Sequence, residues 1–233
     1  MLLNASKEND GGCCVNQERF WGIIEEVISK YQGTKESYLD ELTYQLEKLS
    51  LTEVVLWDNY FEAYLQLAEK EKLWAGAFII NKGDCNEDGF TDFRCWLISM
   101  GKDYYFDIMA QVDDLADLIV KHPENFSAKF EEIIYSGQEV FISKVKRDAS
   151  QRDRDPEALY FDYVNNLALG AEVTHQLALE LALDKNINFS WNENSTKRFK
   201  RELPKLCQKY LGYLNKYAMK YEISVVNTEF GEG

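Results

Sequence analysis

Hydrophobic residues recur every three or four positions along most of the chain, which is the spacing that places side chains on one face of an α-helix. The first such stripe runs from Phe20 to Tyr31, between Asn16, a good helix cap, and Gly33. A second stripe consists of four leucines at Leu39, Leu42, Leu46 and Leu49. The pattern therefore predicts two amphipathic helices in the first 50 residues, each with one face toward a core.

The next segments continue this pattern and include the most apolar stretch of the chain. Ser50 and Glu53 match a capping box, so we expect a third helix from Ser50 to about Ala68. Residues 73–80 are apolar almost all round, which is typical of a helix enclosed on every side. This segment is the predicted centre of the fold.

The remaining chain is also predicted to be mainly helical. A stripe beginning at Phe90 ends at Gly101, where a left-handed residue would close the helix, and helical spacing continues from residue 102 to about 146 with a break at His122-Pro123. Asp155-Pro156 is a good start for another helix. The last helical stretch, about 194–218, is interrupted at Pro204, and residues 221–226 are typical of a short strand or an ordered tail.

These elements predict a compact, all-α, multi-helix single domain, with a C-terminal helical subdomain and a short terminal strand as further candidates. We divide the chain into a disordered tail (1–15), an acidic helical core (16–143), a charged linker or helix end (144–155), C-terminal helices packed on the core (156–220) and a tail (221–233). Only 3 prolines and 13 glycines in 233 residues agree with long helices rather than a turn-rich sandwich.

Charge is unevenly distributed and narrows the range of partners. The net charge is −14, and residues 1–143 hold 27 Asp and Glu against 12 Lys and Arg, whereas the rest is nearly balanced. An acidic surface repels phosphate backbones and attracts basic proteins, so we expect a basic protein partner and no nucleic acid. Solubility alone is the alternative reason for such a charge.

Other global features indicate a cytoplasmic protein with reduced thiols. We find no apolar run long enough to cross a membrane and no signal-peptide pattern, so no membrane association is expected. The five cysteines, Cys13, Cys14, Cys85, Cys95 and Cys207, lack metal-binding or disulfide-framework spacing. The oligomeric state cannot be read from the sequence.

Residues 84–95, "DCNEDGFTDFRC", begin like an EF-hand calcium loop. Asp84, Asn86, Asp88, Gly89 and Asp92 occupy acceptable positions, but Cys95 stands where a calcium loop needs a bidentate Glu. The hydrophobic stripe also places a helix start near Asp88, which conflicts with a non-helical loop. We therefore predict that these carboxylates serve the helix N-terminus and that no metal is bound.

No catalytic constellation is recognisable, and neither a catalytic residue nor a cofactor is predicted. Arg94 lies on or beside the buried stripe, where it either pairs with an acidic neighbour or clamps an anionic ligand. His175 and His122 have no partners at useful spacing, so we interpret them as packed or surface imidazoles. The basic cluster around Phe199 is interpreted as the solvated face of a helix.

Four blocks of sequence, "RFWGIIEEV", "LWAGAFIINKGDCNEDGFTDFRCWLISMGKDYY", "FEEIIYSGQEVFISK" and "FSWNENSTKRFKRELPKLCQKY", resemble the bacterial family known as domain of unknown function 4240. The resemblance extends from about Arg19 to Tyr210. It implies a helical cytosolic protein and supplies no activity, catalytic residue or cofactor. It also marks Asp88, Phe90, Arg94 and Trp96 as typical of the family, as either a structural hub or a site.

Two functions follow as hypotheses. The first is a non-enzymatic acidic protein-binding module, such as an inhibitor or immunity protein that neutralises a basic partner. The alternative is an enzyme or small-ligand binder with a pocket around Asp84, Asp88, Asp92, Arg94 and Trp96.

Overall fold

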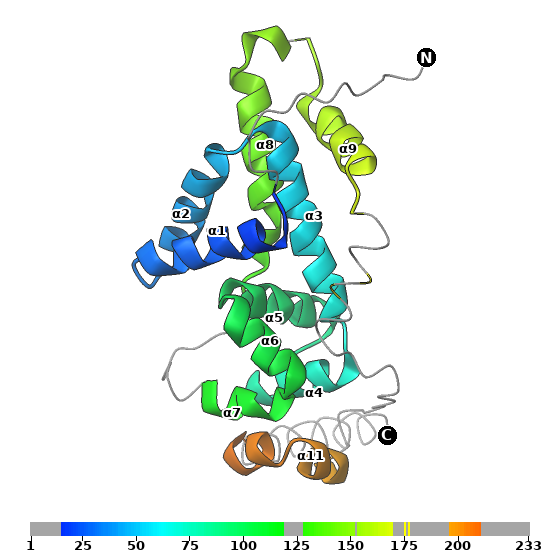
Figure 1. The fold of residues 1–233 in the computed structure, drawn as a ribbon. Helices are drawn as coiled ribbons and strands as arrows, with labels where there is room; N and C mark the ends of the chain where they lie inside the picture. Colours follow the sequence, from blue (N-terminus) through cyan, green and yellow to red (C-terminus); the bar gives the residue numbers. More distant parts are fainter. Residues whose placement is uncertain are drawn as a thin grey trace, which may run out of the picture.

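The computed structural model describes residues 15–118, 128–151, 153–169, 175, 177 and 196–210, and every regular element among them is a helix. The predicted all-α class is thus confirmed. The helices form an elongated body, with α1, α2, α3, α8 and α9 in one half and α4, α5, α6 and α7 in the other (Figure 1). The predicted terminal strand, the C-terminal tail, residues 1–14 of the predicted N-terminal tail and the His122-Pro123 break lie outside the described residues. Val15, which was assigned to that tail, is described and buried.

The N-terminal helices begin at side-chain caps. In α1 (Gln17–Lys30) the Asn16 side chain accepts a hydrogen bond from the Arg19 N–H, as predicted. Helix α2 (Lys35–Glu47) begins four residues before its leucine stripe, at a capping box formed by Thr34 and Ser37. Helix α3 (Leu51–Leu67) begins at the predicted Ser50–Glu53 capping box.

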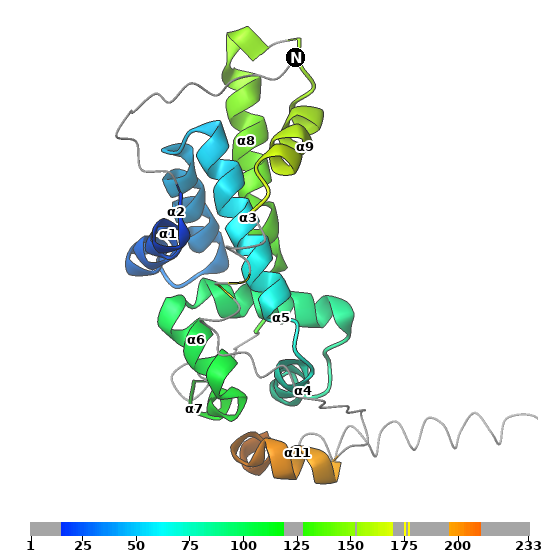
Figure 2. The same ribbon diagram turned by 45° about the vertical axis from the view of Figure 1, so that its right-hand side comes forward.

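Helix α3 is the central element of the fold. It packs against α1, α5 (Glu87–Ser99), α8 (Ser136–Arg147) and α9 (Pro156–Asn166). The 45° rotation in Figure 2 shows the same arrangement, with α3 beside α8 and α5 crossing their lower ends. Aromatic rings fill the space between α1 and α3: Phe20 stacks on Tyr64 with centroids 5.2 Å apart, and Trp21 lies 4.7 Å from the same ring.

Helices α4 (Glu71–Ile80), α5 and α6 (Lys102–Ala110) form the second half of the core. Every residue of α4 from Ala75 to Ile80 is buried, in agreement with the enclosed helix that the sequence predicts. Gly101 separates α5 from α6 with a φ of 98°, as predicted from its position. The Glu25 carboxylate then accepts a hydrogen bond of 2.9 Å from the Lys102 N–H, so α1 fixes the start of α6.

The rest of the chain alternates short and longer helices. The bounds are 3₁₀-helix η1 (Val112–Asp114), α7 (Leu115–Leu118), η3 (Glu131–Tyr135), α8, η4 (Ala149–Gln151), α9, α11 (Thr196–Glu202) and a further helical turn over 204–210. Helix α8 continues through residue 143 and ends at Arg147, so residues 144–147 are a helix end rather than a linker. Asp155 caps α9, with Pro156 in the first turn, as predicted.

None of the helices within the described ranges combines the length and the apolar character required to span a lipid bilayer.

Candidate functional site

The acidic stretch from Asp84 to Asp92 starts helix α5. The Asn86 side chain accepts a hydrogen bond of 2.9 Å from the Gly89 N–H, and the helix begins at Glu87. This start leaves only three residues of the twelve-residue calcium motif outside the helix, and Cys95, at the last position, is buried within it. A calcium loop requires most of those residues to be non-helical, so this backbone does not fit one.

In the described parts of the chain, no three His, Cys, Asp or Glu side chains are grouped so that they could hold a metal ion.

Asp92 connects α5 to a segment almost 40 residues further along the chain. Its carboxylate accepts a hydrogen bond of 2.8 Å from the Glu131 N–H, while its backbone carbonyl accepts one of 3.1 Å from the Phe130 N–H. Beside it, Lys129 Nζ lies 3.2 Å from Asp84 Oδ2. Residues 129–131 and the start of η3 therefore lie along the first turns of α5.

This packing gathers carboxylates from two segments on one surface, which we call the acidic surface. Its members are Asp84, Glu87, Asp88, Asp92, Glu131 and Glu132. Four of these side chains are exposed, while Asp92 and Glu131 are half-buried. Two lysines contact the acidic surface, Lys129 at Asp84 and Lys35 at 3.6 Å from Glu132, so carboxylates outnumber their neighbouring cations.

Arg94 points toward the end of α3. Its Nη1 donates a hydrogen bond of 3.0 Å to the Leu65 carbonyl, one of the last carbonyls of α3, which have no partner within the helix. Its Nη2 donates to Thr91, and the guanidinium lies 4.8 Å from the Phe90 ring centroid. The expected acidic neighbour is Glu69, at 3.8 Å.

The Arg94–Glu69 pair is long and at the rim of the protein, because 72% of the Glu69 side chain is exposed. The principal contacts of Arg94 are therefore neutral oxygens and an aromatic face. The positive guanidinium therefore lies beside the carboxyl end of α3 and offsets the partial negative charge of that helix end.

Trp96 is buried and packs on Phe93 with ring centroids 5.4 Å apart. The structure thus brings Asp84, Asp88 and Asp92 to one surface, while Arg94 and Trp96 are engaged inside α5's packing interfaces. The three aspartates and the pair Arg94 and Trp96 therefore lie in different surroundings.

Sequence reasoning missed the role of Trp74. Its ring stacks on Phe90 with an interplanar angle of 2° and a centroid distance of 5.1 Å, and its indole N–H donates a hydrogen bond of 2.8 Å to the Cys85 carbonyl. Trp74 therefore holds the loop that carries Asp84 against α4. The signal is the Leu73-Trp74 pair, which the hydrophobic pattern assigns only to a buried helix.

Asp58 was missed as well, although it interrupts the apolar run of α3. Tyr160 of α9 donates a hydrogen bond of 2.8 Å to Asp58 Oδ2, and burial raises the pKa of this carboxyl to about 7. Gly137 of α8 lies so close that a Cβ at this position would come within 1.9 Å of Asp58 Oδ1. Asp58 is a contact point between α3, α8 and α9, separate from the acidic surface.

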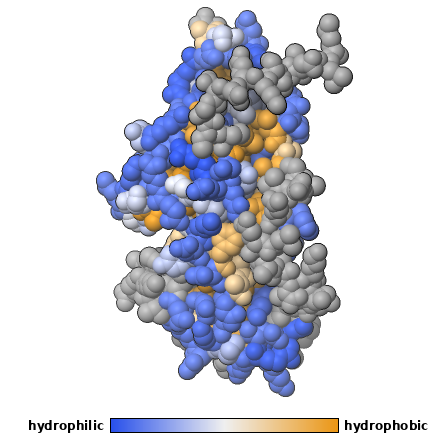
Figure 3. Space-filling model, in the orientation of Figure 1, coloured by the Kyte–Doolittle hydropathy of each residue, from blue (hydrophilic) through white to orange (hydrophobic). Residues whose placement is uncertain are grey.

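The face of the molecule in Figure 3 is hydrophilic over most of its described residues, with hydrophobic side chains in a narrower central band. Phe161 of α9, at 55% exposure, and Tyr44 of α2, at 58%, are among the exposed large hydrophobic side chains. Isolated exposed aromatic residues of this kind are common on protein surfaces. Charge is therefore the more informative surface property.

Comparison with known proteins gives a family and no function. A family model described as "Protein of unknown function (DUF4240)" matches residues 15–143, which is more than half of the chain. The match ends at residue 143, whereas the resemblance seen in the sequence extends to about Tyr210, so the C-terminal block at residues 189–210 lies outside the match. No curated protein and no solved structure gives a match.

Proposed function

Because the chain belongs to the DUF4240 family, whose function is unknown, we propose from its surface chemistry that it is a non-enzymatic module that binds a basic protein partner. In this proposal it acts as an inhibitor or immunity-type protein in the cytoplasm. The observation that supports the proposal most strongly is the acidic surface, where carboxylates from α5 and residues 131–132 lie together with two lysine contacts.

The proposal rests on electrostatics. Exposed carboxylates on a rigid helical scaffold attract a basic surface over several ångströms and raise the rate of association. Asp92 and Asn86 fix the backbone of this region through hydrogen bonds, so the charges are held in place before a partner arrives. Such preorganisation lowers the entropic cost of binding.

The contacts of Arg94 also favour docking over a ligand clamp. A clamp requires guanidinium N–H groups directed at an incoming anion. Here Nη1 and Nη2 are hydrogen-bonded to Leu65 and Thr91 within the protein. An anionic ligand would have to displace both contacts.

The test is capture of partners from a lysate of the organism that encodes the protein. The bait is the whole chain, compared with a Glu87→Lys/Asp88→Lys variant that reverses two exposed charges of the acidic surface. The control is Asp103→Lys/Asp107→Lys, which makes the same change in net charge on exposed positions of α6. The α5 variant places two lysines in the first turn of its helix and the control places one, so circular dichroism confirms that both variants are folded before capture.

We expect the unchanged chain and the α6 control to capture the same basic protein at low salt, and the α5 variant to lose it. Raising the ionic strength should weaken capture, because exposed charges are screened. Equal capture by both variants would show that the acidic surface is not the docking site. A failure to capture any stoichiometric partner at low salt would contradict the proposal as a whole.

A further inference from the structure

Part of the surface of residues 15–143, the region that matches the family model, is covered by residues from outside that region. Phe199, Leu203, Leu206 and Cys207 are almost completely buried. Phe199 lies 6.2 Å from Phe78 of α4, and a Cβ on Gly76 would come within 3.7 Å of Leu206. In both ribbon views, α11 and the following turn lie beneath α4 and α7 (Figures 1 and 2). This C-terminal segment, residues 196–210, therefore seals an apolar face formed by α4, η1 and α7.

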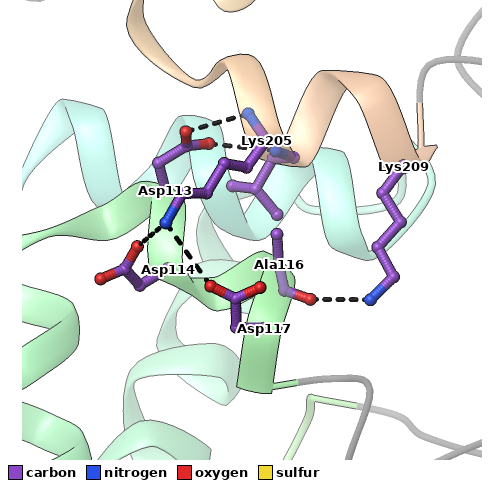
Figure 4. Close-up of polar contacts among 7 residues, drawn as sticks. Asp113, Asp114, Ala116, Asp117, Lys205 and Lys209 are labelled. Carbon is purple, nitrogen blue, oxygen red and sulfur yellow. Dashed lines mark hydrogen bonds and ion pairs between the residues drawn. The ribbon is translucent and has the colours of Figure 1, made fainter.

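Asp113 supplies the polar part of this contact (Figure 4). Its two carboxylate oxygens accept hydrogen bonds from the Lys205 and Leu206 N–H groups, at 2.9 and 3.0 Å. These N–H groups belong to the first turn of residues 204–210 and have no partner within that helix. Asp113 is buried on η1 and thus acts as a helix cap supplied by the opposite side of the interface.

The lysines of the segment add charge complementarity (Figure 4). Lys205 Nζ pairs with Asp114 and lies 3.5 Å from Asp117. Lys209 Nζ donates a hydrogen bond of 2.7 Å to the Ala116 carbonyl in α7. The face thus binds three features of a basic amphipathic helix: its apolar side, its first-turn N–H groups and two of its lysines.

The same contacts indicate that the segment can be displaced. Helix α11 has seven residues and ends before the break at Leu203, and a helix of this length has little stability of its own. The ion pairs of Lys205 are exposed, and such pairs contribute little free energy and weaken with salt. An element held by four apolar side chains, one buried carboxylate and exposed ion pairs opens at a lower free energy than the core.

We propose that the face formed by α4, η1 and α7 is a second interaction surface, whose ligand is a basic amphipathic helix of a partner protein. The chain's own residues 196–210 occupy this face in the isolated protein and leave it when the partner helix binds. This surface shares no residue with the acidic surface, and its test does not depend on the function proposed above.

The first test measures the opening of the segment in the full chain through Cys207. Cys207 and Cys95 are both buried, at 2% and 0% exposure, and burial raises the pKa of both thiols, so each reacts only when its surroundings open. With a maleimide reagent and peptide mapping, we expect Cys207 to react at least about tenfold faster than Cys95, and faster still at high salt. Equal rates for the two thiols would show that the segment opens only on global unfolding, which would overturn the proposal.

The second test supplies the ligand in trans. A synthetic peptide with the sequence of residues 196–210, carrying Ser in place of Cys207, is added in excess to the full chain. We expect the reaction rate of Cys207 to rise with peptide concentration and to saturate, while that of Cys95 stays constant. A control peptide with Phe199→Asp keeps most of the charge pattern and should have no effect, because it lacks the side chain that packs near Phe78.

A Phe199→Asp/Leu203→Asp variant of the full chain tests the receptor face directly. A fluorescent form of the peptide should bind this variant at least about tenfold more tightly than the unchanged chain, because the competing segment is undocked. Circular dichroism reports whether the variant is folded. If the folded variant does not bind the peptide, or if the peptide leaves Cys207 labelling of the unchanged chain unaltered, the face is a fixed structural contact and the proposal fails.

Discussion

The Asp58 carboxyl lies where α3, α8 and α9 meet, and its pKa of about 7 makes the stability of the fold dependent on pH. The folded protein binds a proton at this group more tightly than the unfolded chain does. The contribution of Asp58 to the free energy of unfolding is therefore fully present below the ordinary carboxyl pKa of 3.8 and is lost as the pH rises to about 7.

Replacing Asp58 by Asn removes this titration and keeps an oxygen that can accept the Tyr160 hydrogen bond. We expect the difference in unfolding free energy between Asp58→Asn and the unchanged chain to shift by roughly 1–3 kcal/mol in favour of the variant between about pH 5 and about pH 8. Urea unfolding at both pH values measures it. Two proteins whose stabilities change in parallel with pH would show that Asp58 is not the group responsible.

Gly101 offers a second prediction at the scale of one residue. Its φ of 98° is unfavourable for other residues, and a Cβ would come within 2.6 Å of the Glu25 carboxylate that caps α6. Gly101→Ala should lower the free energy of unfolding by about 1–3 kcal/mol, as measured by thermal or urea unfolding.

The matched control is Gly22→Ala. Gly22 lies inside α1, is exposed, and has nothing within 4 Å of a Cβ. Because alanine is the better helix former, this change should raise the stability by about 0.5–1 kcal/mol. Equal effects of the two substitutions would show that backbone conformation at Gly101 is not the determining factor.

At the scale of elements, the start of α5 has one capping side chain, the Asn86 amide, and carboxylates that we assign to docking. Asn86 provides the cap, while Asp84 is exposed and pairs only with Lys129 at the surface among the contacts that the structure records. Asn86→Ala should therefore lower the unfolding free energy by about 1 kcal/mol. Asp84→Ala should cost at most about 0.5 kcal/mol, because exposed ion pairs contribute little.

A calcium titration provides a second test of the start of α5. Since α5 begins at Glu87, we expect calorimetric titration of the unchanged chain with calcium to give no binding heat at submillimolar concentrations. The stability difference between the two alanine variants should be the same with and without calcium. Binding that disappears in Asp84→Ala would instead identify a metal site.

The elements differ in how far they could be predicted from the sequence. Asn16, Ser50 and Asp155 were recognised as helix starts because a capping side chain acts on backbone groups within three residues of it. The start of α2 was missed, since its first turn lies outside the leucine stripe and is fixed by Thr34 and Ser37.

The sequence contained no comparable signal for contacts between elements that are far apart along the chain. Asp92 was assigned to the start of its own helix, but its carboxylate accepts a hydrogen bond from Glu131. Arg94 has the acidic neighbour that one hypothesis expected, Glu69 at 3.8 Å, but its shorter contact, at 3.0 Å to the Leu65 carbonyl, was not predicted. Periodicity shows which face of a helix is buried, and it contains no information about the element that covers it.

At the scale of the whole molecule, the net charge of −14 becomes informative only through its placement. The C-terminal segment, which contributes basic residues, is docked on α4, η1 and α7. Two of its lysines, Lys205 and Lys209, contact Asp114, Asp117 and the Ala116 carbonyl. The acidic surface on α5 and η3 keeps most of its carboxylates exposed. The family match places this surface within the family domain and the C-terminal segment outside it.

The most direct test of the central claim is the association rate of the captured basic partner with the acidic surface, measured by stopped-flow at several salt concentrations. For the unchanged chain and for Asp103→Lys/Asp107→Lys, we expect a rate constant that falls steeply with ionic strength. For Glu87→Lys/Asp88→Lys it should be about tenfold lower at low salt, with a shallower salt dependence. Identical rate constants and salt dependences for the two variants would contradict the claim that the carboxylates of α5 and η3 form the docking surface.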